Sequence, residues 1–556
     1  MRDRRLFLVV AACAVVVHLG ALWNQFALDD VTIVVVNPLV QSLSGVWRAF
    51  AAPYWPANLG GLVFRPLPVA TYALDWQLHS PAWFHAVNLL WHAGVAVSVA
   101  ALARRWTSAP AALAAGLIFA VHPVHVEAVA SVIGRAELMA TVGTCLAVYA
   151  AVVLDSIAWS AAFLVVGLLS KENAAVAPAL IVWAWVLGLA GPSRQRMVRY
   201  GVSWIAIAIA YLAVRWIVLR PYEGFQNLAA QFLGQGPIAI RLTAIGAFVD
   251  VTRLLFVPLH LQADYSPVER VTITTPLDPR FVLGLLCVAV WAALLVLAWR
   301  RGRRVEAYGL GWIAIGYLPV ANLLFPHGVL VAERLLYLPS AGLALAVGAA
   351  LDRIPRRAWA IVVTVLVGVG AVRSALRVPV WRNNGALALS MIADAPRSYR
   401  SWDYLGWELL WAGKNERALE SFRRAGQIYR ADARVYLAAA HMAYVLKRVP
   451  LADSLLVRAD SACPQCPGAY RNQANAARMR GDTAAAEFLL QHIQALPRYR
   501  IQHDQLRGRS DDHREGGWVD GQRVAHHDHE DLFDLRWFDA AGAGQQGRRT
   551  EVRVRI

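Results

Sequence analysis

Charged residues are scarce in this sequence. Asp, Glu, Lys and Arg together make up 16% of the 556 residues, whereas an ordinary soluble protein is about a quarter charged. Hydrophobic residues make up 58%, and the mean hydropathy is +0.43. So large a surplus of apolar side chains cannot be buried inside a soluble globule of this size. The composition therefore excludes a soluble enzyme.

Cysteine and lysine are also rare. Five cysteines are too few for a fold built on disulfides. Only three lysines accompany 51 arginines, a bias that we attribute to genome composition. The formal net charge is +17, and the calculated isoelectric point is about 10.1. This excess of positive charge would suggest a nucleic-acid partner unless the arginines serve another purpose.

Long apolar runs recur along the first two thirds of the chain. A bilayer core needs roughly 20 apolar residues for each helical span. We expect eleven spans, near residues 6–23, 83–103, 109–121, 136–154, 157–170, 173–190, 199–219, 281–299, 307–325, 335–351 and 357–376. The first could be a cleaved signal peptide, but it lacks a small-residue cleavage site and ten further spans follow, which favours an uncleaved span.

The arginines gather in the loops between these runs. Positive loops stay in the cytoplasm, and an even number of expected spans separates each cluster from the next. The clusters are Arg2, Arg4 and Arg5; Arg104 and Arg105; Arg194, Arg196 and Arg199; Arg300, Arg301, Arg303 and Arg304; and Arg353, Arg356 and Arg357. Most of the net charge therefore reflects membrane topology, and we expect no nucleic-acid partner.

One apolar stretch, 238–258, would break this topology if it crossed the membrane. It carries Arg241, Asp250 and Arg253, so we interpret it as an interfacial or re-entrant helix. Eleven spans with an inside N-terminus place loop 24–82 outside, together with everything after residue 377. The protein is thus expected in the inner (plasma) membrane, with its C-terminal part on the periplasmic side.

A repeat begins near residue 398. Trp402, Tyr436 and Tyr470 are spaced by 34 residues, and so are Gly406, Ala440 and Ala474; Ala418, Ala452 and Ala486; and Phe422, Leu456 and Leu490. This period with alternating large and small positions is typical of tetratricopeptide repeats. We expect about three repeats over 398–497, forming a short α-solenoid whose concave face would bind a peptide or protein. An unrelated helical bundle is the alternative.

The sequence therefore predicts an all-α protein with three parts: a polytopic membrane helix bundle (1–380), a tetratricopeptide-repeat domain (381–497) and a disordered tail (498–556). Cys463 and Cys466 in CPQC could form a disulfide outside the cytoplasm; a redox or zinc site is the alternative. The tail carries HHDH at 526–529. Such a tract can bind metal, but disorder or a frame-shifted end explains it better.

Asp29 and Asp30 follow the first expected span directly. Adjacent carboxylates at a membrane boundary can supply a general base and a second group that orients or binds substrate, although a solvated loop pair is the simpler interpretation. The second span carries His85, Asn88 and His92 at i, i+3 and i+7. Such a polar stripe needs a packing partner, and hydrogen bonding between helices would explain it without a catalytic role.

The segment HPVHVEAVASVIGRAELMA at 122–140 joins two expected spans on the outer side. It contains many ionisable groups for a turn, and groups of this kind at membrane depth are usually functional. They are His122, His125, Glu127, Arg135 and Glu137. HxxHxE could suggest zinc, but the proline turn and the lack of helical context argue against metal ligation, and we expect no metal site.

Cations follow at three further places of the same outer side. Lys171 and Glu172 lie in SKEN, Glu333 and Arg334 in AERLLYLPS, and Arg65 in FRPL within loop 24–82. The arginine guanidinium suits phosphate oxygens, and lysine supplies a point charge. The adjacent residues Lys171 and Glu172, or Glu333 and Arg334, could instead form self-neutralising salt bridges.

The ordered series of motifs DD, FRPL, FHxVNxLxH, HPVHVEAVASVIGRAE, SKEN and AERLLYLPS, followed by tetratricopeptide repeats, resembles the transmembrane and tetratricopeptide-repeat O-mannosyltransferase family. This is a branch of the multi-pass glycosyltransferases of GT-C type. The likeness covers roughly residues 1–497. The chain departs from animal members in having about three repeats where they have many, and in its tail.

This resemblance implies a GT-C-like fold and a polyprenyl-phosphate sugar, such as mannose, as donor. Asp29 or Asp30 would be the catalytic base that deprotonates an acceptor hydroxyl. Arg334, Arg65 and Lys171 would stabilise the leaving phosphate, so no metal or other cofactor is required. The acceptor protein or peptide would bind at the repeats.

Three other functions remain open at this point. The protein could be a non-catalytic membrane scaffold whose repeats recruit outer proteins, or a transferase that acts on a cell-surface glycan or lipid. A transporter would carry its charges at mid-span, whereas these lie at the outer ends. This placement favours a transferase.

Overall fold

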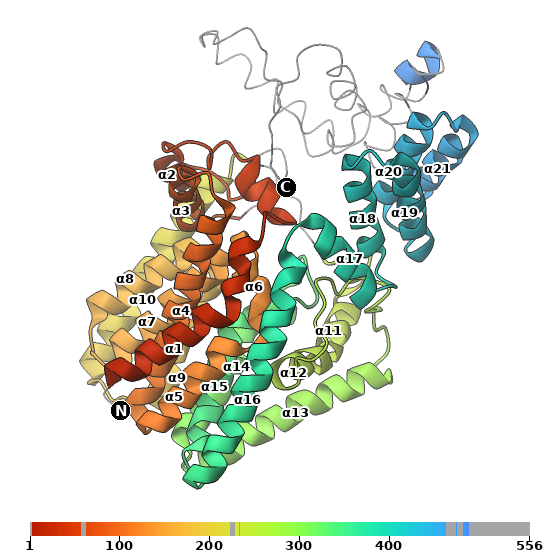
Figure 1. Cartoon of the computed structure of the whole chain (residues 1–556). Coiled ribbons are helices and arrows are strands. Elements are labelled where there is room, and N and C mark those ends of the chain that lie inside the picture. Colours follow the sequence, from red (N-terminus) through yellow and green to blue (C-terminus); the bar gives the residue numbers. More distant parts are fainter. Residues whose placement is uncertain are drawn as a thin grey trace. The chain divides into compact units, whose positions relative to one another are not determined.

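The computed structural model describes residues 3–56, 63–222, 228–232, 234–462, 474, 477 and 482–488. All regular elements within these residues are helices, with no strand among them, so the expected all-α fold is confirmed. The chain divides into two compact units, Met1–Pro396 and Arg397–Ile556. Figure 1 shows the helices of the two units.

A helix occupies each of the eleven apolar runs expected to span the membrane. These helices are α1 (Asp3–His18), α4 (Pro81–Trp106), α5 (Ala109–Val121), α7 (Arg135–Val152), α8 (Ile157–Ser170), α9 (Ala177–Val186), α10 (Arg194–Leu219), α13 (Pro279–Arg300), α14 (Arg304–Tyr317), α15 (Tyr337–Leu351) and α16 (Arg356–Arg377). Seven helical segments of the described chain are long and apolar enough to cross a membrane, or eight if the bent pair Ala109–Val121 and Pro123–Ala130 is one span. The protein is thus a multi-pass membrane protein.

The apolar runs of the sequence predict eleven spans, whereas seven or eight helical segments of the described residues are long and apolar enough to be candidate spans. Helices α8 and α14 have 14 residues each, which corresponds to about 21 Å, less than the roughly 30 Å of a bilayer core. Helix α8 ends where the polar SKEN segment begins, and α5 ends at the HPVH segment. These polar segments therefore begin at the ends of helices that are too short to reach across the membrane.

The arginine clusters meet at one end of the bundle. Arg104 Nε lies 3.0 Å from an Asp3 carboxylate oxygen, Arg196 Nε lies 2.7 Å from Asp155, and Arg353 Nε lies 2.7 Å from Glu306. The first pair joins the start of α1 to the end of α4, the second joins the loop before α8 to the start of α10, and the third joins the start of α14 to the loop before α16. We call this the arginine-rich end.

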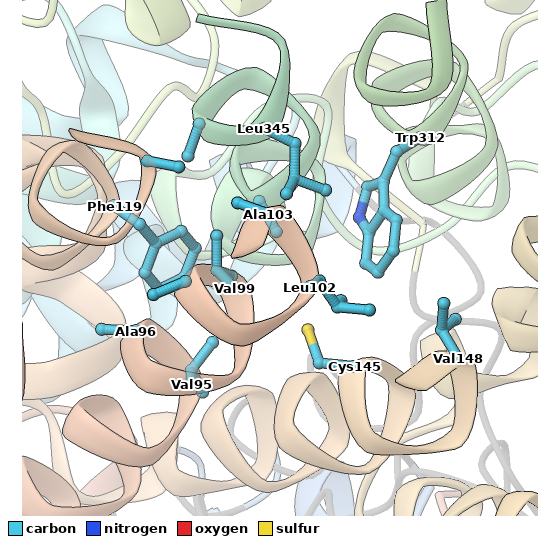
Figure 2. Packing of buried hydrophobic residues seen from close by; sticks show 14 of the residues in the cluster. Val95, Ala96, Val99, Leu102, Ala103, Phe119, Cys145, Val148, Trp312 and Leu345 are labelled. Atoms are coloured by element: carbon cyan, nitrogen blue, oxygen red, sulfur yellow. The ribbon is translucent and has the colours of Figure 1, made fainter. Parts of the chain in front are cut away.

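The bundle core consists mainly of small and branched apolar residues from α1, α4, α5, α7, α9, α14 and α15. Figure 2 shows part of it, where Val99, Leu102 and Ala103 of α4 are drawn between Phe119 on one side and Trp312 on the other. Glycines let two helix pairs approach closely. A Cβ on Gly143 would lie 2.8 Å from Gly167 Cα between α7 and α8, and one on Gly309 would lie 2.3 Å from the Gly342 carbonyl oxygen between α14 and α15. Such contacts are typical of membrane helices.

The stretch 238–258 forms two short helices, α11 (Pro237–Gly246) and α12 (Phe248–Phe256). Neither is among the candidate spans of the described chain, which agrees with the interfacial or re-entrant interpretation. Loop 24–82 contains two further short helices, α2 (Gly45–Arg48) and α3 (Pro66–Trp76). The first unit also includes α17 (Asn384–Asp394) and extends to Pro396, beyond the expected boundary at residue 380.

The second unit contains two described helix pairs with the expected period. Helix α20 (Ala433–Val445) begins and ends 34 residues after α18 (Tyr399–Trp411), and α21 (Val449–Ala462) does the same relative to α19 (Asn415–Ile428). A Cβ on Gly406 would lie 2.5 Å from the Phe422 ring. The glycine at the small position of the repeat therefore leaves room for the phenylalanine at the large position. Tyr470, Cys463, Cys466, Leu490 and the tail with HHDH lie outside the described residues.

Candidate active site

The ionisable residues of the predicted site lie at the end of the bundle opposite the arginine-rich end. They come from the loop after α1, the segment before α3, and three 3-10 or short helical turns. These turns are Pro123–His125 with α6 (Val126–Ala130), Glu172–Val176 before α9, and Glu333–Leu336 before α15. The first turn follows α5, the second follows α8 and the third precedes α15, so each lies at the end of an apolar helix.

Asp30 is buried and fully engaged. Its two carboxylate oxygens accept hydrogen bonds from the Ile133 amide (2.9 Å), the Ser131 hydroxyl (3.0 Å), the Val132 amide (3.2 Å) and the Ala27 amide (3.3 Å). Burial raises the pKa of Asp30 to about 6, although the four hydrogen bonds act in the opposite direction. The hydrogen bonds of Asp30 therefore connect the loop after α1 with the segment before α7.

Asp29 has a different environment from its neighbour. Its side chain is only half-buried and lies within electrostatic range of Arg334 and of Tyr54. The preceding residue, Leu28, has a φ of +55°, and its amide donates to the Asn384 side chain at 2.7 Å. A contact with α17 thus holds this left-handed turn in place.

Arg334 pairs with Glu127 across the bundle. The Arg334 amide donates to Glu127 at 2.8 Å, and the guanidinium forms an ion pair with the same carboxylate. Glu333 instead accepts from the Gln262 amide (2.6 Å) and the Tyr265 hydroxyl (3.2 Å). The possible self-neutralising Glu333–Arg334 bridge is therefore wrong.

The second adjacent pair also separates. Lys171 forms an ion pair with Glu137, and Asn173 donates to the same carboxylate at 2.9 Å. Glu172 accepts from Arg65 Nη2 at 2.9 Å and Nε at 3.1 Å. Lys171 has an extended backbone between α8 and the next turn (φ −161°, ψ 144°), which turns successive side chains to opposite sides. The possible Lys171–Glu172 bridge is therefore wrong as well.

The three cations predicted to bind phosphate come together. Lys171 lies within electrostatic range of both Arg65 and Arg334, and Glu137 lies within range of all three. Arg65 also lies over the Tyr54 ring, 5.3 Å from its centre. Together with Asp29, these groups form a cluster that we call the outer cluster, defined by Asp29, Arg65, Lys171 and Arg334.

His327 belongs near this cluster, although no sequence motif indicated it. Its Nε2 lies 2.7 Å from the Val320 carbonyl oxygen. Burial lowers the pKa of His327, and the charges of Lys171 and Arg334 lower it further. His327 therefore lies within electrostatic range of two of the predicted phosphate-binding cations. Its position in an irregular loop, without a periodic or charged motif, gave the sequence analysis no signal.

Arg135 supports the cluster from within the protein. Its side chain is fully buried, forms an ion pair with Asp75, and donates to the Asn88 side chain (2.8 Å) and the Phe84 carbonyl (2.9 Å). Asn88 in turn donates to the Ser131 carbonyl at 2.9 Å. Arg135 therefore links α3, α4 and α7 beneath the loop that holds Asp30, and Asp75 is a partner that the sequence analysis missed.

The predicted histidines lie buried between helices. His92 Nδ1 is 2.7 Å from the Tyr337 hydroxyl, and His125 Nε2 is 2.7 Å from the Ser340 hydroxyl. His122 Nε2 is 3.0 Å from the Leu255 carbonyl oxygen, and His85 is fully buried in α4. Hydrogen bonding between helices thus explains the histidines that have these partners.

The zinc alternative for HxxHxE is not supported by these contacts, because His122, His125 and Glu127 bind three different partners. Among the residues that the structure describes, no group of three or more His, Cys, Asp or Glu side chains is placed to hold a metal ion.

Comparison with known proteins supports the motif series. The chain is 27% identical over 354 residues to the Caenorhabditis elegans protein O-mannosyl-transferase F38B6.6, covering 61% of this chain and 50% of that protein. It is 26% identical to Drosophila melanogaster Tmtc3 (83% and 59% covered) and 26% identical to human TMTC4 (75% and 65% covered), both protein O-mannosyl-transferases.

The chain spans about half the length of the curated relatives it matches. No protein-family model matches the chain. The expected resemblance is nevertheless confirmed by relatives that match over most of the chain: this membrane protein is a homologue of the transmembrane and tetratricopeptide-repeat O-mannosyltransferases.

Proposed function

We propose that the protein is a membrane glycosyltransferase that moves a sugar, mannose in the first instance, from a polyprenyl-phosphate donor to a protein hydroxyl on the outer face of the membrane. The observation that carries this proposal is the outer cluster, in which Lys171 lies within electrostatic range of Arg65 and Arg334, and Asp29 lies within range of Arg334. A carboxylate beside several cations suits a reaction that needs both a base and a phosphate leaving group.

Arg334 and Arg65 are the best candidates for the first contacts with the donor phosphate. Their side chains are 29% and 20% exposed, whereas that of Lys171 is 11% exposed. Each is now paired with a carboxylate, so an incoming phosphate has to share or displace that partner. Guanidinium groups can bind two phosphate oxygens at once while keeping part of an existing ion pair. Lys171 then contributes mainly through its charge.

Asp29 is the better candidate for the base. The carboxylate of Asp30 already accepts four hydrogen bonds inside the protein, whereas Asp29 is half-buried. In the proposed step, the acceptor oxygen attacks the anomeric carbon and its proton passes to Asp29. The bond between the anomeric carbon and the phosphate oxygen breaks, and the phosphate leaves with the bonding electrons, stabilised by the cations.

The placement of this step outside the cytoplasm rests on charge. The arginine-rich end is the part of the bundle that the positive-inside rule assigns to the cytoplasm, and the outer cluster lies at the other end. We further propose that the helix pairs α18–α19 and α20–α21 bind the acceptor protein, since repeats of this period present peptide-binding surfaces. This mechanism requires no metal, because the cations of the outer cluster can stabilise the leaving phosphate. A cell-surface glycan or lipid is the alternative acceptor.

The proposal is tested by transfer from a radiolabelled polyprenyl-phosphate mannose, with polyprenyl-phosphate glucose and arabinose in parallel. Full-length protein in lipid nanodiscs is mixed with each donor and with candidate acceptor proteins. We expect label on a protein hydroxyl from one of the donors. If folded protein transfers no lipid-linked sugar to any acceptor, the transferase is excluded and the membrane scaffold becomes the better account.

A further inference from the structure

Helix α10 carries an arginine inside an otherwise lipid-facing span. Of its 26 residues only Tyr200 and Leu219 are buried, and large apolar side chains such as Ile205, Ile209 and Leu212 are about 60% exposed. Arg215 lies one turn before the end of this helix. A charged residue within an apolar span is costly and is usually retained for a function.

Arg215 lies on the one face of α10 that contacts the bundle. Trp204, Ile207 and Tyr211 pack against the buried cluster that includes Leu164 and Leu168 of α8. Arg215 follows Tyr211 by four residues, which places it on the same helix face, one turn further along. It is half-buried, whereas the residues directly before and after it are exposed. The arginine therefore follows this stripe toward the end of α8.

The end of α8 is where the outer cluster begins. The Tyr211 hydroxyl lies within electrostatic range of Glu172, Arg65 and Arg215, and the Tyr211 ring centre lies 6.4 Å from that of Phe64. This hydroxyl is buried and has no hydrogen-bond partner among the described residues. Buried polar atoms are nearly always hydrogen-bonded, so this unpartnered hydroxyl, within electrostatic range of two arginines, can accept a ligand as its partner.

We propose that Arg215 and Tyr211 bind the phosphate of a polyprenyl-phosphate lipid that reaches the outer cluster along α10. The proposal rests on the proposed function and adds the side from which the donor arrives. The guanidinium and the phenolic hydroxyl both donate to phosphate oxygens, and Arg65 is the next cation inward. The isoprenoid tail then lies against the exposed apolar side chains of α10, within the membrane.

The composition of α10 favours a lipid rather than a soluble phosphate as the ligand. The groups that flank Arg215 on the outward side are apolar and exposed, including Leu212 and Trp216. A water-soluble anion would lose its hydration on approaching along such an apolar surface. The tail of an anionic lipid, by contrast, favours that surface. An arginine that merely extends toward the membrane surface is the competing explanation.

Arg220 provides a matched control for that explanation. It lies just after the same helix, is exposed, and stacks over the Trp216 ring at 5.1 Å. It has the same charge about 7.5 Å further along the helix axis, but its ring partner, Trp216, is exposed. A general attraction of the membrane interface for arginine affects both residues, whereas a specific phosphate contact involves Arg215 alone.

The test measures binding of a sugar-free, long-chain polyprenyl phosphate that carries a photoreactive group, using full-length protein in nanodiscs. We expect Arg215→Gln to weaken binding about tenfold and Tyr211→Phe about threefold, the effects of losing a charged and a neutral hydrogen bond. Arg220→Gln should bind like the unchanged protein. Excess inorganic phosphate should not compete, whereas competition by it would overturn the assignment to a lipid.

Equal binding by the Arg215→Gln and Arg220→Gln proteins, each with an unchanged melting temperature, would contradict the proposal. Tyr211→Phe removes one oxygen only, so it reports on the site even if the arginine variant fails to fold. The probe carries no sugar and no transfer is measured. A failure of the proposed transferase reaction therefore remains distinguishable from a failure of this lipid-phosphate site.

Discussion

Lys171 forms its ion pair with Glu137, 34 residues earlier in the chain, and not with its neighbour Glu172. The pair is nearly buried, with the two side chains 11% and 2% exposed. Glu172 binds Arg65 of the loop after α1 instead. Ion pairs between distant segments therefore hold the outer cluster together, and they fix the positions of the cations that we propose to bind phosphate.

Lys171→Met should lower the thermal stability of the protein. It leaves the Glu137 carboxylate buried with Asn173 as its remaining described partner, and breaking a buried pair typically costs about 3–5 kcal/mol. The double variant Lys171→Met with Glu137→Leu should recover part of this loss because no charge is left unpaired. Melting temperatures in nanodiscs provide the measurement. Arg448→Gln breaks the exposed pair with Glu416 and serves as the control, with little expected effect.

Asp30→Ala should destabilise the first unit, while Asp29→Asn should not. The alanine leaves four donors without their acceptor, two amides and the hydroxyl of residues 131–133 and the Ala27 amide. Each unsatisfied buried group costs about 1–3 kcal/mol. The expected result is a clear drop in melting temperature for Asp30→Ala alone. An equal drop for both variants would contradict the different roles assigned to the two aspartates.

The pKa of Asp30 predicts a pH dependence of stability. Burial raises this pKa from the model-compound value of 3.8 to about 6 in the folded protein, so the folded state holds the proton more tightly than the unfolded state. Stability from this group is therefore greatest below about pH 4 and falls as the pH rises to about 6. The difference in melting temperature between the unchanged protein and Asp30→Asn, followed from pH 4 to 7, should show this trend. A difference that is constant with pH would contradict it.

Arg334→Gln should impair sugar transfer per folded protein, beyond the loss of stability expected from leaving the buried Glu127 carboxylate without its cation. The variant removes a cation that we propose stabilises the leaving phosphate, and losses of such contacts reduce turnover about 10²–10³-fold. Arg334→Lys should recover only part of the rate because lysine lacks the planar fork. Arg280→Gln is the control, since Arg280 binds Asp278 at the exposed start of α13. Equal rates for the two glutamine variants would remove Arg334 from the proposed mechanism.

Gly406→Ala should destabilise the second unit alone. The added methyl group would lie 2.5 Å from the Phe422 ring, and overpacking of this kind costs about 1–3 kcal/mol. Limited proteolysis should show faster cleavage at sites within the second unit, Arg397–Ile556. The cleavage rate within the first unit should not change. Gly413, at φ +70° with no atom within 4 Å of an added Cβ, gives a comparison in which backbone strain acts without a clash.

The helices, and the motifs that meet in the outer cluster, could be predicted from the sequence. The ion pairs between the side chains of the cluster could not. Apolar runs mark helices because a span needs a continuous apolar surface, and the 34-residue period is met by α18–α21. The motifs that carry Asp29, Arg65, Lys171 and Arg334 do converge. The alternation of arginine clusters also places these motifs at one end of the bundle.

The pairing of charges could not be predicted, because it depends on the direction of each side chain in the folded protein. Extended backbone at Lys171 sends that residue and Glu172 to different partners. His327 and Arg215 were missed for a related reason. One lies in an irregular loop and the other in an apolar helix, so only tertiary packing brings them near the cluster.

One measurement tests whether Asp29 is the base of a sugar transfer. It compares the Asp29→Asn and Asp278→Asn proteins for transfer of radiolabelled mannose from polyprenyl-phosphate mannose to a protein hydroxyl. Asp278 is a carboxylate at the start of α13 that caps the helix by accepting from the Arg280 amide at 2.9 Å, and asparagine keeps that capping role. We expect transfer by the unchanged and Asp278→Asn proteins and none by a normally folded Asp29→Asn protein, which would lack the base. Undiminished transfer by Asp29→Asn would contradict this expectation.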